Sequence, residues 1–188
     1  MPSVHIRQRL AWLALLCIGV DWSSIALAAS DRCEAAMKFR AVSELAKQST
    51  DYEAQIAQIR LALAREQRTA LTAGDSEARA AAESEDAGLE GLLPALNDLG
   101  SKLATAVYLA GARDEMRDRR DSAALLGYIR LLAQDGLAAA STSIAATGDA
   151  LSSTRRPGVA AALSKISDFL PRARDAFQAC ANPGAAAR

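Results

Sequence analysis

The chain has 188 residues, a length that suits a single domain. Hydrophobic residues make up 51% of it but aromatic residues only 4%. This composition suits close-packed helices better than a β-sandwich, in which aromatic and β-branched residues are enriched. The 22 basic and 22 acidic residues give a formal net charge of zero. The chain therefore lacks the strongly basic character of nucleic-acid-binding domains, and we expect no nucleic-acid partner.

The N-terminal residues predict a cleaved secretory signal peptide over residues 1–28. Basic side chains come first, an apolar run follows over residues 10–20, and the small residues Ala26 and Ala28 form a cleavage site. Cleavage is expected after Ala28 or Ala29. The apolar run is shorter than the ~20 residues that a spanning helix needs, which disfavours a membrane anchor. The bulky Leu16 disfavours lipid attachment at Cys17.

Removal of the signal peptide limits the chemistry of the mature chain. The only histidine, His5, is lost with it. Without histidine there is no Ser-His-Asp triad, histidine zinc site or histidine-ligated haem. Phosphate-binding and dinucleotide-binding glycine motifs are also missing from the sequence. We therefore expect a non-catalytic protein with no cofactor and no metal site.

Two cysteines remain in the mature chain, Cys33 near its start and Cys180 near its end. In an exported protein such a pair predicts a disulfide, with free thiols or an intermolecular bridge as the alternatives. The bridge would close a loop through nearly the whole mature chain. The loop-entropy relation gives it about 4–5 kcal/mol of stabilisation.

Residues 89–110 carry the clearest helical pattern. Seven apolar residues recur at alternating steps of three and four, which places them on one stripe of a helix: Leu89, Leu92, Leu96, Leu99, Leu103, Ala106 and Ala110. Pro94 falls near the start of this stretch, where a first helical turn tolerates proline. The pattern is typical of a seam in a helical bundle.

Three further helices are expected around this one. The first covers residues 31–73, with a local irregularity at a capping-box pattern from Thr50 to Glu53. Two helices with a break near residues 48–50 are the alternative. The next begins with Ser122 as its cap, and the last begins at Pro157. The spacing of apolar residues in the helix that begins at Ser122 predicts this buried stripe: Leu126, Ile129, Ala133, Leu137, Ala140, Ile144, Thr147 and Leu151. The last helix has the stripe Val159, Leu163, Ile166, Leu170, Ala173, Phe177 and Cys180.

These patterns predict an all-α protein, an antiparallel bundle of four long helices over residues 29–182. The first helix is expected to be the longest, so part of it projects or packs against residues 74–88. An even number of helices brings Cys33 and Cys180 to the same end, as a disulfide requires. The acidic run from Glu83 to Asp86, followed by Gly88 and Gly91, predicts a flexible elbow. Residues 183–188 are expected to be a disordered tail.

Residues 113–121 form the most charged segment of the chain. Four of its basic residues are candidates for binding an acidic partner: Arg113, Arg117, Arg119 and Arg120. Interleaved aspartates weaken this interpretation, and a solvated helix end or bend is the alternative. No motif in the chain identifies a protein family.

The sequence leads to the hypothesis of an exported, non-catalytic bundle that binds another protein of the envelope or the secreted fraction, or itself. It would act as an accessory subunit, adaptor or inhibitor. The expected location is the periplasm, with secretion to the medium as the alternative, and no stable membrane insertion after cleavage. The second hypothesis is a small-molecule or lipid carrier, because alanine and glycine on the seams leave space for a cavity. The projecting part of the first helix is the other candidate surface for a partner.

Overall fold

A computed structural model describes residues 32–38 and 40–181 of the chain. The expected signal peptide and C-terminal tail lie outside these residues. Five helices account for most of the described part: α3 (Arg40–Ala73), α4 (Ser76–Glu90), α5 (Leu92–Glu115), α6 (Arg119–Ser153) and α7 (Pro157–Ala181). Residues 32–38 are helical as well. The described residues contain no strand, so the predicted all-α class is confirmed.

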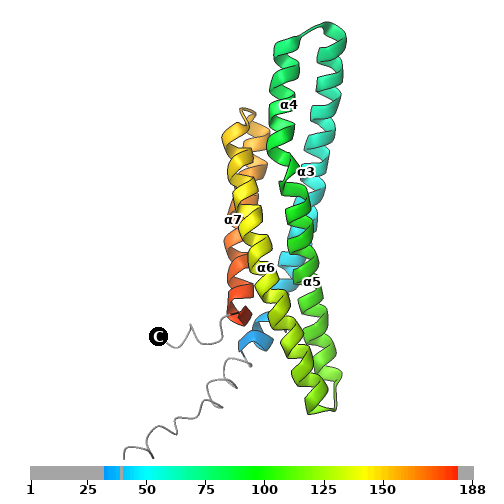
Figure 1. Cartoon of the computed structure of the whole chain (residues 1–188), viewed down its shortest axis with the longest axis vertical. Coiled ribbons are helices and arrows are strands. Elements are labelled where there is room, and N and C mark those ends of the chain that lie inside the picture. Colours follow the sequence, from blue (N-terminus) through cyan, green and yellow to red (C-terminus); the bar gives the residue numbers. More distant parts are fainter. Residues whose placement is uncertain (1–31, 39, 182–188) are drawn as a thin grey trace, which may run out of the picture.

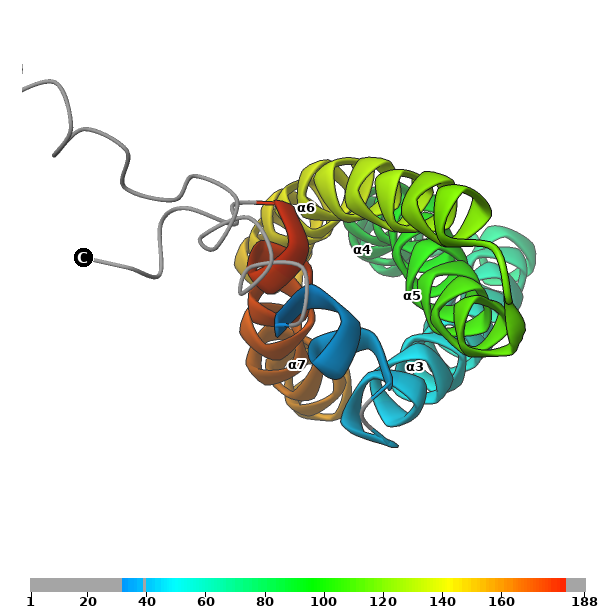
Figure 2. The same ribbon diagram turned by 90° about the horizontal axis from the view of Figure 1, so that it is seen from below.

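The helices pack as an antiparallel bundle of four rods (Figure 1). One rod is made of α4 and α5 together, because Gly91 between them has helical backbone angles of φ −75° and ψ −19°. Pro94 lies in the first turn of α5, as predicted. The expectation that the first helix is the longest is not met, since α3 has 34 residues and α6 has 35. Residues 32–38 belong to a separate short segment that Figure 2 shows turned across the end of the bundle.

A disulfide joins that short segment to the last helix. Cys33 and Cys180 are bonded, with their Cα atoms 4.5 Å apart. Both side chains are buried, as is Met37 one turn further along the segment. The predicted pairing is confirmed, and so is the expectation that an even number of rods brings the two cysteines to one end.

The seams predicted for residues 89–110 and 157–180 are buried in the structure. All seven residues of the first seam are at most 1% exposed, and those of the last helix form the facing part of the core. Phe169 and Phe177 of α7 are the largest fully buried side chains. The spacing of leucine and phenylalanine therefore identified the core-facing sides of α5 and α7 correctly.

The seam predicted for α6 is wrong in its second half. Ile144 and Leu151 are 38% and 36% exposed, whereas Ser143 and Ala150 are buried. The buried stripe keeps alternating steps of three and four through Gly136, Ala140, Ser143, Thr147 and Ala150, whereas the predicted stripe took a second step of four in a row, from Ala133 to Leu137. The sequence did not distinguish the two stripes, because the neighbouring positions of α6 carry mostly small residues of similar hydrophobicity.

The predicted elbow is also wrong, because α4 runs through the acidic segment without a break. The acidic side chains have partners: Glu83 pairs with Arg79, at 2.6 Å, and Asp86 pairs with Arg60, at 2.7 Å. Gly88 marks a close contact between helices. A Cβ placed on it would lie 2.2 Å from the Ser153 Oγ of α6.

Two predicted helix caps have other roles. The Thr50 hydroxyl lies inside α3 and donates to the carbonyl of Ala46, at 3.3 Å, so no capping box forms there. Asp118, not Ser122, caps α6, since its carboxylate accepts a hydrogen bond from the Arg120 amide at 2.7 Å. Between α3 and α4, Gly74 has a positive φ of 73°, and the Asp75 side chain caps α4 by accepting a hydrogen bond from the Ala78 amide.

None of the helices in the described part of the chain is long and apolar enough to span a membrane.

Candidate functional site

The α3–α4 hairpin projects beyond the turn that joins α6 to α7 (Figure 1). We call residues 67–84 the hairpin tip. Of the described helices, only α3 and α4 extend to this end of the molecule; Ala70 and Ala82 are buried there, and every residue from 71 to 81 is exposed. The prediction that part of the first helix projects, packed against residues 74–88, is confirmed.

An arginine at the start of α7 holds the tip against the rest of the bundle. The guanidinium of Arg156 donates to Glu66 of α3, at 2.6 Å, and its Nε lies 2.5 Å from the carboxylate of Glu85 in α4. The hydrogen bond from Arg156 lowers the pKa of Glu66 below its ordinary value. The same contact raises the pKa of Arg156, so the arginine stays charged. One residue thereby joins three helices.

Glu85 is the most deeply buried acidic residue of this cluster, at 6% exposure. Its Oε1 accepts hydrogen bonds from the Arg155 amide, at 3.1 Å, and from the Thr154 hydroxyl, at 3.2 Å. Its other oxygen, Oε2, forms an ion pair with Arg156 but accepts no hydrogen bond from the described residues. A hollow of ≈ 500 Å³ opens beside it. We assign Glu85 an anchoring role, because one of its oxygens accepts two hydrogen bonds from the α6–α7 turn and the other forms an ion pair with Arg156.

The outer side of the tip carries apolar surface. Leu71, in the last turn of α3, is 61% exposed. It borders a hollow of ≈ 390 Å³ between the two helices, which is also lined by Ala70, Gly74 and Ala80 and, at its edge, by charged residues of α4. The sequence located the projection but did not single out Leu71. Its exposure follows because, among helices α3 to α7, only α3 and α4 reach the tip.

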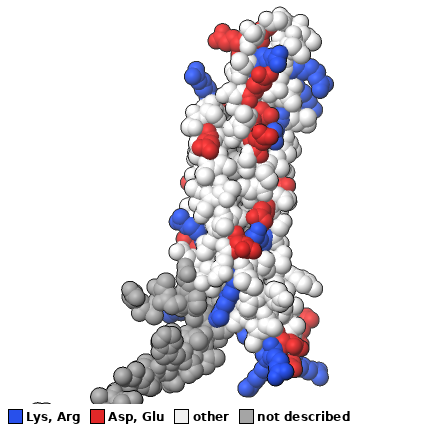
Figure 3. Space-filling model, in the orientation of Figure 1, with Lys and Arg blue, Asp and Glu red and all other residues white. Residues whose placement is uncertain are grey.

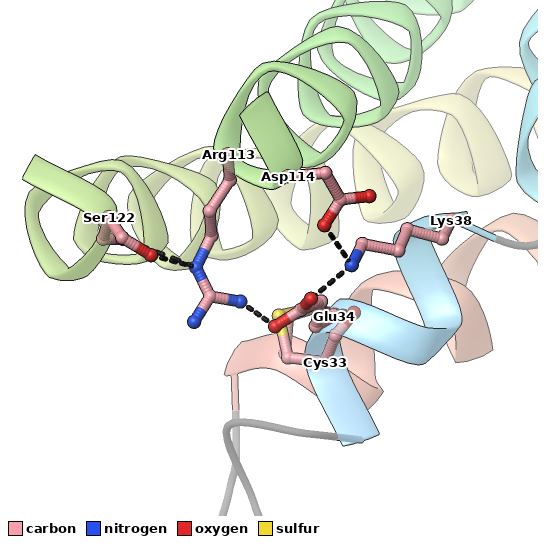
Figure 4. A network of polar contacts seen from close by, with 7 residues as sticks. Cys33, Glu34, Lys38, Arg113, Asp114 and Ser122 are labelled. Atoms are coloured by element: carbon pink, nitrogen blue, oxygen red, sulfur yellow. Dashed lines mark hydrogen bonds and ion pairs between the residues drawn. A yellow bond between two sulfur atoms is a disulfide. The ribbon is translucent and has the colours of Figure 1, made fainter. Parts of the chain in front are cut away.

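Of the four candidate arginines, Arg113 is used inside the protein. Its Nε donates to the Ser122 hydroxyl at 2.9 Å, and its guanidinium forms an ion pair with Glu34 (Figure 4). Lys38 links the same Glu34 to Asp114. This network ties the disulfide-linked N-terminal segment to the α5–α6 turn, and the Arg113 side chain is only 17% exposed. Arg113 is thus a structural link between these two segments.

The other three arginines lie at the turn between α5 and α6. Arg117 is in the turn itself, and Arg119 and Arg120 begin α6; all three are exposed. Figure 3 shows basic and acidic side chains gathered at this lower end of the molecule. The segment is a bend, as the sequence allowed, and three of its four candidate arginines are accessible to a partner.

Small residues on the seams are used for close packing. A Cβ on Gly136 of α6 would lie 2.5 Å from the ring of Phe177, and one on Gly100 of α5 would lie 3.0 Å from the Ser49 hydroxyl. Hydroxyl groups of α6 bond back to their own helix, as Thr147 does to the carbonyl of Ser143 at 2.8 Å. These positions therefore do not provide the space that the carrier hypothesis assigned to them.

Within residues 32–38 and 40–181, no group of three or more metal-binding side chains comes together. The chain matches no protein-family model, and comparisons with curated proteins and with solved structures find no match for it.

Proposed function

We propose that this protein is an exported, non-catalytic helical bundle that binds another protein of the cell envelope or the secreted fraction through its hairpin tip. The observation that carries the proposal is the exposed Leu71 beside a hollow, on a two-helix projection that no third helix of the described residues covers. An exposed pair of helices can dock by adding its apolar side to a helix or groove of a partner.

The anchoring of the tip favours a docking role. Arg156 and the Glu85 contacts hold the base of the projection, so the tip is presented as a fixed shape. A preorganised surface loses less conformational entropy on binding than a flexible one. Charged side chains around the hollow, such as Arg79 and Glu83, supply the polar rim that surrounds the apolar centre of a typical interface.

The export part of the proposal rests on the disulfide. Disulfides persist in oxidising compartments and are rare in the cytosol of most cells. The Cys33–Cys180 bridge is therefore compatible with passage to the periplasm, our preferred destination, or to the medium. The mass of the protein from an exporting bacterial host tests this: cleavage after Ala28 or Ala29 is expected, and an uncleaved chain would contradict export.

The non-catalytic part rests on the engagement of the reactive groups. The described residues include no histidine. The buried carboxylate, Glu85, is held by an arginine and by the α6–α7 turn. General acid or base catalysis needs a group free to exchange a proton with a substrate.

Site-specific photocrosslinking in the exporting host tests the docking role. A photoreactive residue at position 71 should capture the same protein reproducibly, and one at Arg174 on the side of α7 should not. Arg174 is a matched control because its side chain is also exposed but belongs to the second half of α7, toward the helix end opposite the α6–α7 turn. Leu71→Glu should abolish capture by a photoreactive residue at the neighbouring position 72 while leaving the helical circular dichroism unchanged. Equal capture at positions 71 and 174, or none at 71, would refute tip binding.

A further inference from the structure

A second exposed apolar surface lies on α6, far from the hairpin tip. Tyr128 is 61% exposed and Leu131 is 58% exposed, one turn apart on the same side of the helix. Exposed residues continue this line in both directions at steps of three or four. We call the whole set the α6 outer stripe: Arg120, Ala124, Tyr128, Leu131, Asp135, Ala138 and Thr142.

A groove between α5 and α6 runs beside one end of this stripe. It has a volume of ≈ 410 Å³, and its charged lining residues are Asp98, Lys102 and Asp135. Asp98 is already paired with Lys102 of its own helix. Asp135 has no ion-pair partner among the described residues, and neither has the guanidinium of Arg120 at the opposite end of the stripe. The stripe is therefore basic at one end, apolar at its centre and acidic toward the other end.

We propose that two copies of this chain associate antiparallel through the α6 outer stripe. A twofold axis midway between Tyr128 and Leu131 places Tyr128 of each copy against Leu131 of the other. The same axis brings Arg120 of each copy toward Asp135 of the other. An interface of this kind uses the same patch on both subunits, so the patch must complement itself. The charge order along the stripe meets that condition.

The spacing along the helix agrees with this arrangement. At a rise of 1.5 Å per residue, Arg120 lies about 14 Å from the axis and Asp135 about 8 Å from it on the other side. An antiparallel neighbour therefore places Arg120 about 6 Å beyond Asp135 along the helix, a gap that an extended arginine side chain can span. The small residues Ala124 and Ala138 lie on the same stripe and allow the two α6 helices to approach closely.

Burial of the central pair supplies the main driving force. Tyrosine is enriched at protein interfaces because its ring is apolar while its hydroxyl stays hydrated at the edge. Leu131 beside it adds aliphatic surface that is otherwise in contact with water. The arginine–aspartate contacts then fix the direction and register of the two helices, as charged pairs at the rim of an interface do.

Sedimentation equilibrium of the protein with its disulfide closed tests the association. We expect wild type to reach twice the chain mass in the micromolar range and Leu131→Glu to stay at the chain mass. Leu71→Glu is the matched control, since it makes the same change at an equally exposed leucine outside the stripe, and it should sediment as wild type does. A wild-type monomer in the high micromolar range, or a Leu131→Glu dimer as tight as wild type, would overturn the proposal.

Charge reversal tests the antiparallel register. Arg120→Asp and Asp135→Arg should each weaken dimerisation by about tenfold, because each places like charges together across the interface. The two changes combined in one chain should restore most of the wild-type affinity, since both contacts are then re-formed with exchanged signs. Additive losses in the combined variant would refute this register. The tip and the stripe are separate surfaces, so Leu131→Glu should keep partner capture at position 71, which distinguishes failure of dimerisation from failure of tip binding.

Discussion

Two buried serines are expected to have opposite effects on the free energy of unfolding. Ser49 of α3 donates to the Leu96 carbonyl of α5 at 2.8 Å, whereas the hydroxyl of Ser143 in α6 has no hydrogen-bond partner. Both residues are fully buried. Ser49→Ala should lower the free energy of unfolding by about 1 kcal/mol through loss of that bond. Ser143→Ala should raise it by about 0.5–1 kcal/mol, because an unsatisfied polar group leaves the core. Urea denaturation of both variants measures the difference, and equal signs would contradict it.

Glu66 makes the attachment of the tip sensitive to acid. Its hydrogen bond from Arg156 lowers its pKa in the folded protein, relative to about 4.3 in the unfolded chain. A lowered folded-state pKa contributes stability above the unfolded-state pKa, and that contribution is lost as the pH falls through the folded-state pKa. Glu66→Gln should therefore cost more stability at neutral pH than near pH 3. Urea midpoints at the two pH values test this. The same deficit at both would show that the charge of Glu66 is irrelevant.

At the scale of elements, α6 and α7 approach each other closely at one glycine, Gly136. Gly136→Ala would place a methyl group 2.5 Å from the Phe177 ring and force the packed ring to move. We expect a loss of about 1–3 kcal/mol in the free energy of unfolding. Gly148→Ala in the same helix is the control. Nothing lies within 4 Å of its added Cβ, so alanine should stabilise the helix by about 0.5–1 kcal/mol. Denaturant unfolding measures both changes, and stabilisation at position 136 would contradict the tight packing.

Elements were predictable from sequence where hydrophobic contrast was strong. The leucines of α5 and the phenylalanine and leucines of α7 differ sharply from their neighbours, so only one stripe was possible. In α6, by contrast, alanine, serine and threonine surround Ile144, and several stripes have nearly equal hydrophobicity. Gly88 suggested a break because glycine disfavours a helix. The contact with Ser153 of α6 that explains this glycine is far away in the sequence and could not be predicted from local spacing. The candidate arginines show the same limit. Arg113 forms an ion pair with Glu34 and is therefore not available to a partner, and local sequence spacing does not reveal this ion pair.

At the scale of the whole molecule, the disulfide connects the two ends of the fold. Cys33 and Cys180 are 147 residues apart, so their bond restricts almost the entire described chain when it unfolds. It also attaches residues 32–38, which Figure 2 shows at the end of the bundle. The ion pairs of Glu34 with Arg113 and of Lys38 with Asp114 hold the same segment without a covalent bond. The segment is thus fixed twice, and the two attachments differ in their response to reduction.

Removal of the disulfide should lower the free energy of unfolding more than any of the other substitutions predicted above. For Cys33→Ala combined with Cys180→Ala, the loop-entropy relation predicts a loss of about 4–5 kcal/mol in the free energy of unfolding. The bridge acts mainly by lowering the conformational entropy of the unfolded chain. The variant should therefore keep the helical content of the wild type under native conditions. Urea denaturation with and without a reductant tests this. Reductant should bring the wild-type midpoint to that of the double variant and leave the variant unchanged. A wild-type midpoint that did not respond to reductant would show that the bridge contributes nothing, and the stability of the bundle would then rest on its helix seams alone.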